Sequence, residues 1–236
     1  MSTQPQVYQE HQAATRLMSK TESRRFKFIV LTWLLAVVAS TISAFTQAGW
    51  PAATIIITAE MGLYLVYIYR QRDGWFSRLL LLGTIAGLVE LLAERWLVEA
   101  TGTLVYFPGG PFLLSSPLYF PFAWPLLLLP LGYIARWLSR RHGLLVASMA
   151  TAILAAIDIP IFDALARGAN WYTFQNARML GVVPLYIIAG DFVMMSILPI
   201  VLQAVEKARV VAIVALGILF GLWIWVCYAL AIAVLG

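Results

Sequence analysis

Ionisable side chains in an otherwise apolar chain are the residues most able to do chemistry here. The sequence places six carboxyl groups within stretches that are apolar enough to lie in a lipid bilayer. They are Glu60, Glu90, Glu94, Asp158, Asp163 and Asp191. An ionised side chain at the centre of a bilayer costs about 2.5–3.5 kcal/mol even on the scale derived from insertion experiments. So many carboxyl groups are therefore expected to serve a polar cavity or to stay protonated.

A carboxylic acid in an apolar pocket can perform acid catalysis without a cofactor. Desolvation disfavours its charged form, so the neutral acid can donate a proton, and a second carboxyl group can hold it in place or take a proton back. Such an acid could protonate an alkene or an epoxide. We expect Glu90 or Asp158 to be the donor, supported by Glu94, Asp191 or Asp163.

Aromatic residues gather in the same parts of the sequence, and aromatic faces stabilise cations without offering a nucleophile. We therefore expect a substrate-binding set that contains Glu60, Tyr64, Trp96, Tyr106, Tyr119, Trp124, Trp171, Tyr172 and Tyr186. Each feature also has a plainer explanation. Trp and Tyr collect at membrane interfaces in any case, a buried acid can join two helices by a hydrogen bond, and Asp163 could pair with Arg167 four residues later. Arg95 and Glu99 are expected to snorkel or pair at the interface.

Other kinds of site lack their residues. The chain has two histidines, His11 and His142, and one cysteine, Cys227, so a histidine-based metal site, a histidine catalytic dyad and an intramolecular disulfide are excluded. No aspartate-rich motif for magnesium-dependent prenyl transfer, no P-loop and no GxGxxG in a strand context occurs. We expect neither a metal nor a cofactor.

The elements that must position the acids are membrane-spanning helices. With 62% hydrophobic and 11% charged residues, the composition indicates an all-α integral membrane protein. Seven apolar runs reach the length of about 20 residues that a spanning helix needs. They cover 26–47, 51–69, 76–98, 116–138, 143–166, 181–204 and 210–235. Residues 1–25 are polar and are predicted to form a disordered cytoplasmic tail, and 26–236 a single transmembrane domain.

Basic residues predict the orientation of these helices. They precede the first helix and flank the second, fourth and sixth connections. The positive-inside rule then places the N-terminus in the cytoplasm and the C-terminus outside, and we expect the cell membrane. The net charge of +5 suits anionic membrane lipids and offers no support for nucleic-acid binding. Two long outward connections, 99–115 and 167–180, are expected to fold over the helix ends as lids.

Spacing on the third helix predicts that acids point into the bundle. Gly83, Gly87, Glu90 and Glu94 follow intervals of four, three and four residues, so they share one face. The two glycines allow another helix to approach closely. On the fifth helix, Pro160 lies between Asp158 and Asp163 and is expected to kink or loosen the helix.

The middle of the chain carries an internal similarity. Glu90 precedes the "PLY" of residues 117–119 by 27 residues, with Tyr106 between them. Asp158 precedes the "PLY" of residues 184–186 by 26 residues, with Tyr172 between them. Both units read as helix, outer lid and helix in the same orientation, so we predict a parallel repeat of helices 3–4 and 5–6. The two acid clusters would then face one central cavity.

Seven apolar helices, few histidines, and acids followed by "PLY" segments resemble two groups of proteins. One is the integral membrane carotenoid-biosynthesis proteins, the lycopene cyclases and carotenoid hydratases, and the other is the small membrane-bound terpene cyclases of meroterpenoid pathways. The resemblance covers about residues 85–195. It implies that paired Glu and Asp residues donate a proton without a metal. The Pro-x-Glu-Glu or Pro-x-Glu-Asp signature of heterodimeric lycopene cyclases is absent, and "DIPIFD" has a different spacing.

We therefore expect an intramembrane isoprenoid cyclase, isomerase, lyase or hydratase with a hydrophobic isoprenoid or lipid substrate. Two alternatives stay open. A proton-coupled transporter or lipid-binding protein would use the acids as a relay, and a non-catalytic subunit of a membrane complex would use the aromatic lids as contact surfaces. The sequence does not specify the oligomeric state.

Overall fold

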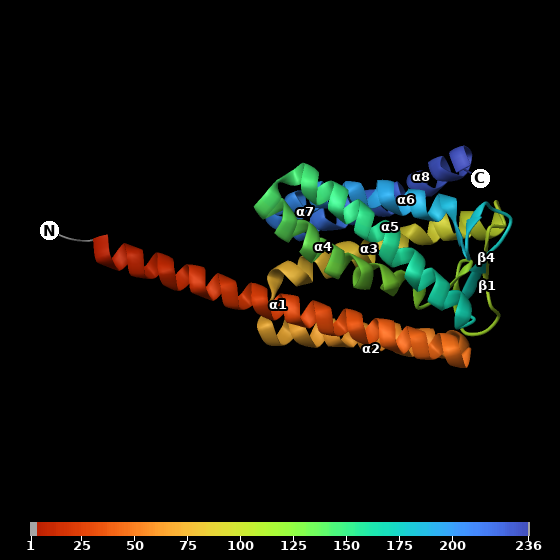
Figure 1. Ribbon diagram of the computed structural model, residues 1–236, viewed down its shortest axis with the longest axis horizontal. Coiled ribbons are helices and arrows are strands. Elements are labelled where there is room, and N and C mark those ends of the chain that lie inside the picture. Colours follow the sequence, from red (N-terminus) through yellow and green to blue (C-terminus); the bar gives the residue numbers. More distant parts are fainter. Residues whose placement is uncertain (1–3, 236) are drawn as a thin grey trace.

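The computed structural model describes the backbone of residues 4–235 and the side chains of residues 20–235 (Figure 1). The helices are α1 (Gln4–Thr46), α2 (Gly49–Gln71), α3 (Gly74–Glu99), α4 (Ala123–His142), α5 (Leu144–Gly168), α6 (Leu185–Ser196), α7 (Leu198–Lys207) and α8 (Val210–Leu235), with the short 3₁₀ helix η1 (Phe120–Phe122). The strands are β1 (Leu104–Tyr106), β2 (Phe112–Leu113), β3 (Ser116–Pro117), β4 (Tyr172–Phe174), β5 (Met179–Leu180) and β6 (Val183–Pro184).

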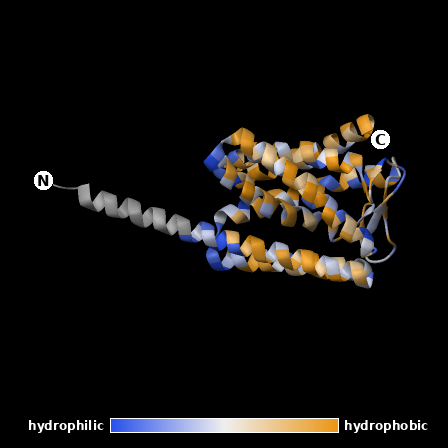
Figure 2. Ribbon diagram, in the orientation of Figure 1, coloured by the Kyte–Doolittle hydropathy of each residue, from blue (hydrophilic) through white to orange (hydrophobic). Residues whose placement is uncertain are grey.

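Seven helical segments within the described residues are long and apolar enough to cross a membrane, as the sequence predicts. The chain is thus a helical, multi-pass membrane protein by length and composition. Figure 2 shows apolar residues along the helices and hydrophilic ones mainly at the two ends. The sixth span combines α6 and α7, which join at Ile197. Pro199 lies in the first turn of α7 and has no N–H to continue the hydrogen bonds of α6.

The first helix extends further toward the N-terminus than the apolar pattern indicates. Arg25, at the end of the predicted tail, donates hydrogen bonds of 2.7 and 2.8 Å to the Asp73 carboxylate. Asp73 in turn caps α3 by accepting from the backbone N–H groups of Trp75 and Phe76. Polar contacts, which hydropathy does not measure, therefore keep this part of the predicted tail helical. Residues 1–3 of the tail lie outside the described part of the chain.

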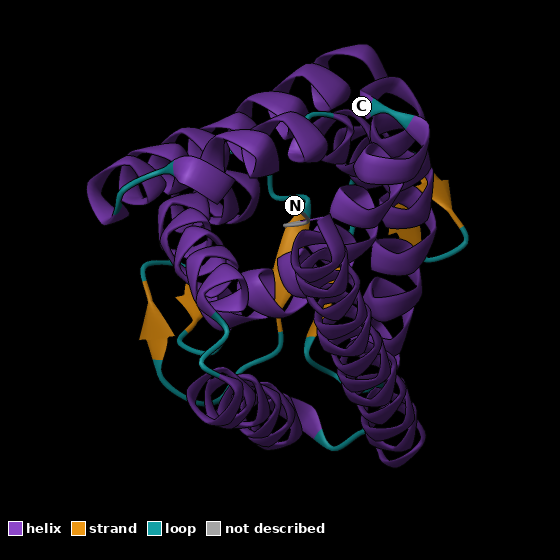
Figure 3. Cartoon of the chain, turned by 90° about the vertical axis from the view of Figure 1, so that its left-hand side faces the viewer, coloured by secondary structure: helices purple, strands orange, loops and turns teal. Residues whose placement is uncertain are grey.

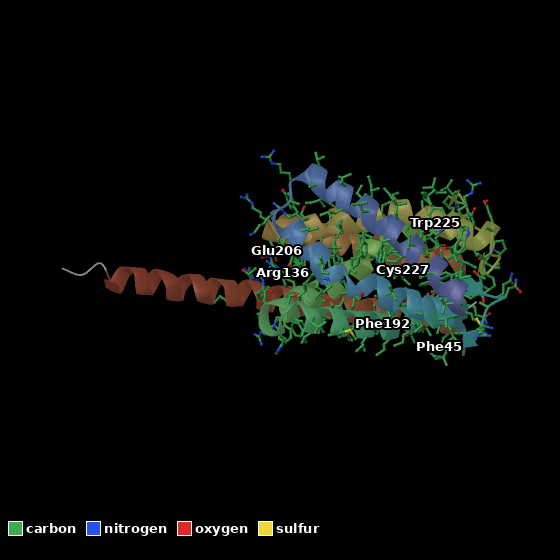
Figure 4. The ribbon with its side chains drawn as sticks, turned by 90° about the horizontal axis from the view of Figure 1, so that it is seen from above. Phe45, Arg136, Phe192, Glu206, Trp225 and Cys227 are labelled. Carbon is green, nitrogen blue, oxygen red and sulfur yellow. The ribbon has the colours of Figure 1, made fainter. Side chains whose placement is uncertain are left out.

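Arginine side chains join the helices at this end of the bundle, opposite the strands. Arg136 of α4 pairs with Glu206 of α7, and Figure 4 shows the two side chains at that end. Arg78 of α3 donates to the backbone carbonyls of Val205, Glu206 and Ala208, where α7 ends. These contacts hold α3, α4 and α7 together at the end of the bundle where the basic residues gather.

The third helix is the centre of the packing, and it contacts α4 and α8 most extensively. A methyl group added at Gly83 would lie 2.5 Å from the Cα atom of Pro125. One added at Gly87 would collide with the Pro121 carbonyl. The two glycines thus allow α4 and η1 to approach α3 closely, which agrees with the face predicted from their spacing. Figure 3 shows the helices from the end opposite the strands.

The two long connections contain short strands, which the sequence analysis did not predict. Strand β1 pairs with β4 in antiparallel fashion, and Tyr106 lies opposite Tyr172. Two hairpins, β2–β3 and β5–β6, lead into η1 and α6. The fourth and sixth spans consequently begin at Phe120 and Leu185 rather than at the predicted 116 and 181. We call the paired strands β1 and β4 the lid sheet; it lies at one end of the bundle (Figure 1).

Candidate active site

A cavity of about 200 Å³ lies beneath the lid sheet, between the α1–α2 pair and helices α3, α4 and α5. Five of the six predicted acids line it. They are Glu60, Glu90, Glu94, Asp158 and Asp163. Five of the predicted aromatic residues line it as well, namely Tyr106, Tyr119, Trp124, Trp171 and Tyr172. None of its described lining residues is Lys, Arg or His. The cavity is therefore acidic, aromatic and otherwise apolar.

Two of the acids are held by tyrosines of the lid sheet. Tyr106 donates its phenolic hydrogen to Oε2 of Glu94, and Tyr172 donates to Oδ1 of Asp163 at 2.7 Å. Because Tyr106 and Tyr172 lie opposite each other in the lid sheet, the sheet directs one donor to α3 and the other to α5. In these contacts Glu94 of α3 takes the place that Asp163 takes on α5. The "PLY" intervals in the sequence instead pair Glu90 with Asp158.

Both lid tyrosines, Tyr106 and Tyr172, keep their phenolic protons and act as hydrogen-bond donors. Burial raises the pKa of Tyr106 well above its ordinary value of 10.0, and the neighbouring Glu94 raises it further. Burial and then Asp163 have the same effect on the pKa of Tyr172. A phenol with a raised pKa keeps its proton at neutral pH. The oxygens of Glu94 and Asp163 that face these phenols therefore accept, and a proton on either acid belongs on the other oxygen.

The aromatic roof of the cavity has a defined geometry. The rings of Tyr106, Phe120 and Tyr172 form a triangle with centroid separations of 5.8, 5.9 and 6.2 Å, and each pair meets edge to face. Such pairs contribute about 0.5–1.5 kcal/mol each beyond the area they bury. The triangle thus fixes the phenols above the acids. Phe120 belongs to the aromatic-rich part of the sequence but not to the predicted substrate-binding set.

Glu90 lies one helical turn from Glu94 and is 1% exposed. Neither of its carboxyl oxygens makes a well-formed hydrogen bond among the described residues, although the side chains of Glu94 and Trp124 lie beside them. Leaving a buried polar group unsatisfied costs about 1–3 kcal/mol. Because Glu90 lies on the wall of the cavity, it is a candidate for binding a ligand.

Asp158 is held by a residue that sequence reasoning missed. The indole N–H of Trp33 in α1 donates to Oδ1 of Asp158 in α5 at 3.0 Å. The two residues are 125 positions apart, so no local pattern could have connected them. Their contact links α1 to α5 at the edge of the cavity, where both side chains are partly exposed.

Asp191 does not line the cavity but contacts a residue that does. It is 0% exposed and accepts a hydrogen bond of 2.9 Å from Tyr228 of α8. Tyr228 lines the cavity and was also missed, because it lies in an apolar span without another polar residue nearby. Asp191 is therefore connected to the cavity through Tyr228.

Three of the predicted binding residues do not line the cavity. The hydroxyl of Tyr64 bonds to Thr32 at 3.0 Å, and Tyr186 donates to Thr103 at 2.8 Å. Trp96 packs against the core. The predicted interface pair of Arg95 and Glu99 forms, at 2.9 Å, with both side chains about half exposed.

Three further expectations concern Asp163, Pro160 and metal binding. The partner of Asp163 in the structure is Tyr172, and none of the ion pairs among the described side chains joins it to Arg167. Helix α5 continues through Pro160 to Gly168. Within the described residues, no group of three or more His, Cys, Asp or Glu side chains is arranged to hold a metal ion.

Comparison with known proteins gives a family without an assigned function. No curated protein and no solved structure matches the chain. A family model matches residues 91–235, more than half of the chain. The matched part contains Glu94, Asp158, Asp163 and Asp191, and it excludes α1, α2 and Glu90. The chain belongs to the family described as the domain of unknown function DUF6989.

Proposed function

We propose that this protein is a metal-independent intramembrane enzyme that protonates an alkene or epoxide of an isoprenoid, as a cyclase, isomerase or hydratase. One observation carries the proposal. Five carboxyl groups and a roof of edge-to-face aromatic rings share a cavity whose described lining has no basic side chain. The carboxyl groups can deliver a proton, and the aromatic rings can stabilise a carbocation. The resemblance to carotenoid-biosynthesis proteins and membrane-bound terpene cyclases supports the same chemistry.

Glu94 is the donor in this proposal, and Asp163 is its partner. The Tyr106 hydroxyl occupies Oε2 of Glu94, so Oε1 can carry the proton toward a substrate. Three buried carboxyl groups, Glu90, Glu94 and Asp163, share the cavity. Because like charges at one site oppose full ionisation, at least one proton stays in the cluster. The donor thus differs from Glu90 and Asp158, which the sequence favoured.

The reaction balances without a cofactor. The π electrons of the alkene take the proton from Glu94, which becomes a carboxylate while the substrate becomes a tertiary carbocation. The aromatic triangle stabilises that cation. In a cyclase, an internal double bond attacks the cation, and loss of a proton to the carboxylate restores Glu94. In a hydratase, water attacks instead and releases the proton that restores Glu94. Tyr106 stabilises the carboxylate throughout by its hydrogen bond.

The finer features of the fold belong to the same proposal. The basic end of the bundle faces the cytoplasm, the lid sheet lies outside, and the membrane is the cell membrane. Helices α3–α4 and α5–α6 form a parallel repeat. Each unit consists of a helix, a strand, a hairpin and a helix, and each strand carries a tyrosine that donates to an acid of the preceding helix. These equivalent contacts support the repeat.

The test uses purified protein in lipid nanodiscs in D₂O, with squalene, 2,3-epoxysqualene, lycopene and geranylgeraniol as separate probes. We expect deuterium in the product of at least one probe, at the carbon that Glu94 protonates. Glu94→Gln should abolish incorporation, because an amide cannot donate an acidic proton. Glu99→Gln is the matched control, since Glu99 is an exposed acid outside the cavity. Probes that bind but never gain deuterium would instead indicate a lipid-binding protein or transporter.

A further inference from the structure

The carboxyl groups of the cavity lie at two depths. Glu90 is four residues from Glu94 along α3, and Asp158 is five from Asp163 along α5. At 1.5 Å per residue, Glu90 and Asp158 lie about 6–7.5 Å further from the lid. Glu60 is eleven residues from the lid end of α2, or about 16 Å, which is close to the depth of the other two. We call Glu60, Glu90 and Asp158 the deep acid tier.

The deep acid tier has more acceptors than donors. Both oxygens of Glu90 are buried and make no well-formed hydrogen bond among the described residues, although the side chains of Glu94 and Trp124 lie beside them. Trp33 supplies a donor to only one oxygen of Asp158. Each of these carboxyl groups offers two acceptor oxygens when ionised and still offers an acceptor oxygen when protonated, and no Lys, Arg or His stands among the described lining residues. A ligand that brings its own hydrogen-bond donor would therefore satisfy the free acceptor oxygens of this tier.

From this arrangement we infer that the deep acid tier binds a hydrogen-bond donor of the ligand, either a hydroxyl or a protonated amine. The substrate is then a functionalised isoprenoid rather than a plain hydrocarbon. Its polar group sits about 6–7.5 Å from the carbon that Glu94 protonates, which is the separation of the two tiers along the helices. The position of the reacting carbon rests on the proposed function, whereas donor binding does not.

The donor would also assist the proposed chemistry. A hydroxyl or ammonium group that donates to Glu90 stabilises the ionised form of that carboxyl group. The proton retained by the cluster then stays on Glu94, next to the reacting bond. Binding of the polar group and loading of the acid would thus occur together.

The experiment measures binding, so it needs no turnover. Farnesol, farnesylamine and farnesyl methyl ether are titrated into the protein in nanodiscs by calorimetry. The three ligands share one chain, and only the ether lacks a donor. We expect the alcohol or the amine to bind at least about tenfold more tightly than the ether, because the ether leaves Glu90 unsatisfied. The stronger of the two identifies the donor as neutral or cationic.

Variants show which residues cause the preference for the alcohol or amine over the ether. Glu90→Gln should reduce it to within about twofold, because the amide supplies its own donor and removes the charge, while the affinity for the ether stays the same. Asp158→Asn is a second variant in case Glu90→Gln does not fold, and it should weaken the preference. Glu99→Gln, which changes an exposed acid outside the cavity, should retain it. Equal affinities for all three ligands in the wild type would overturn the inference. A donor preference without deuterium incorporation would leave the tier standing and reject the proposed reaction.

Discussion

Replacing Tyr106 by Phe removes one hydroxyl and leaves the aromatic roof in place. The ring keeps its edge-to-face contacts with Phe120 and Tyr172 at 5.9 and 5.8 Å, so the packing changes little. What is lost is the donor to Glu94, a carboxyl group that is only 4% exposed. Ser116 lies 3.5 Å from the same oxygen and offers a much longer contact. The substitution therefore leaves Oε2 of Glu94 without a good donor.

The size of the effect follows from the burial of this oxygen. Removing one partner of a buried hydrogen bond costs about 1–3 kcal/mol, and more when the remaining partner is charged. In the proposed reaction Glu94 becomes charged as it gives up its proton, so the loss falls on the transition state. A loss of that size lowers kcat by about 5- to 150-fold. Because neutral Glu94 still binds substrate, KM should change by less than about threefold.

Initial rates of deuterium incorporation measure this prediction, and thermal unfolding followed by circular dichroism reports the fold. Tyr64→Phe is the matched control, since it also removes a buried hydroxyl but lies outside the cavity. If Tyr106→Phe kept the wild-type kcat within about twofold while Glu94→Gln was inactive, the phenol would not stabilise the carboxylate, and the assigned role would be wrong.

Three further predictions concern the fold. Gly83→Ala should lower the free energy of unfolding by about 1–3 kcal/mol in unfolding titrations, because its methyl group would meet the Pro125 backbone. Gly62→Ala is the control, because a methyl group there meets no atom within 4 Å. It should leave the stability unchanged or slightly raised. Asp73→Ala should lower the melting temperature more than Glu99→Ala, because it removes both the cap of α3 and the partner of Arg25. The free energy of unfolding should hold constant as pH rises to about 10 and then fall. The unfolded chain loses its tyrosine protons from about pH 10, whereas burial raises the pKa of Tyr106 and Tyr172 in the folded protein, so they keep their protons to higher pH. Unfolding curves between pH 7 and 11 check this, and the fall should be smaller in Tyr106→Phe.

The seven spans could be predicted from the sequence because hydropathy over about 20 residues is set by the bilayer rather than by tertiary detail. The ends of the spans could not. Strands β1 and β4 have three residues each, and their pairing depends on partners 66 or more residues away, which a local pattern does not contain. The first helix likewise begins before its apolar run, and Arg25 in this earlier part binds Asp73, which lies 48 positions away.

The composition of the site was predictable, but its connections were not. An acid in an apolar run is visible in any sequence, and five of the six predicted acids share the cavity. Choosing between them required knowledge of which tyrosine meets which acid. Glu94 and Asp163 precede their tyrosines by 12 and 9 residues, and this unequal spacing gives no sign in the sequence that both acids accept from lid tyrosines. Trp33 and Tyr228 reach the site from helices that the predicted repeat did not include.

The lid sheet makes the two acids depend on one element. Tyr106 and Tyr172 are opposite each other in the same pair of strands, so a displacement of that sheet removes the donors of Glu94 and Asp163 together. The same displacement would open the aromatic roof and admit water, which competes for both the proton and the carbocation. The tyrosines orient both acids only while the lid sheet covers the cavity. In the proposed reaction, this coupling would make proton delivery conditional on a closed, water-poor chamber, which chemistry through a carbocation requires.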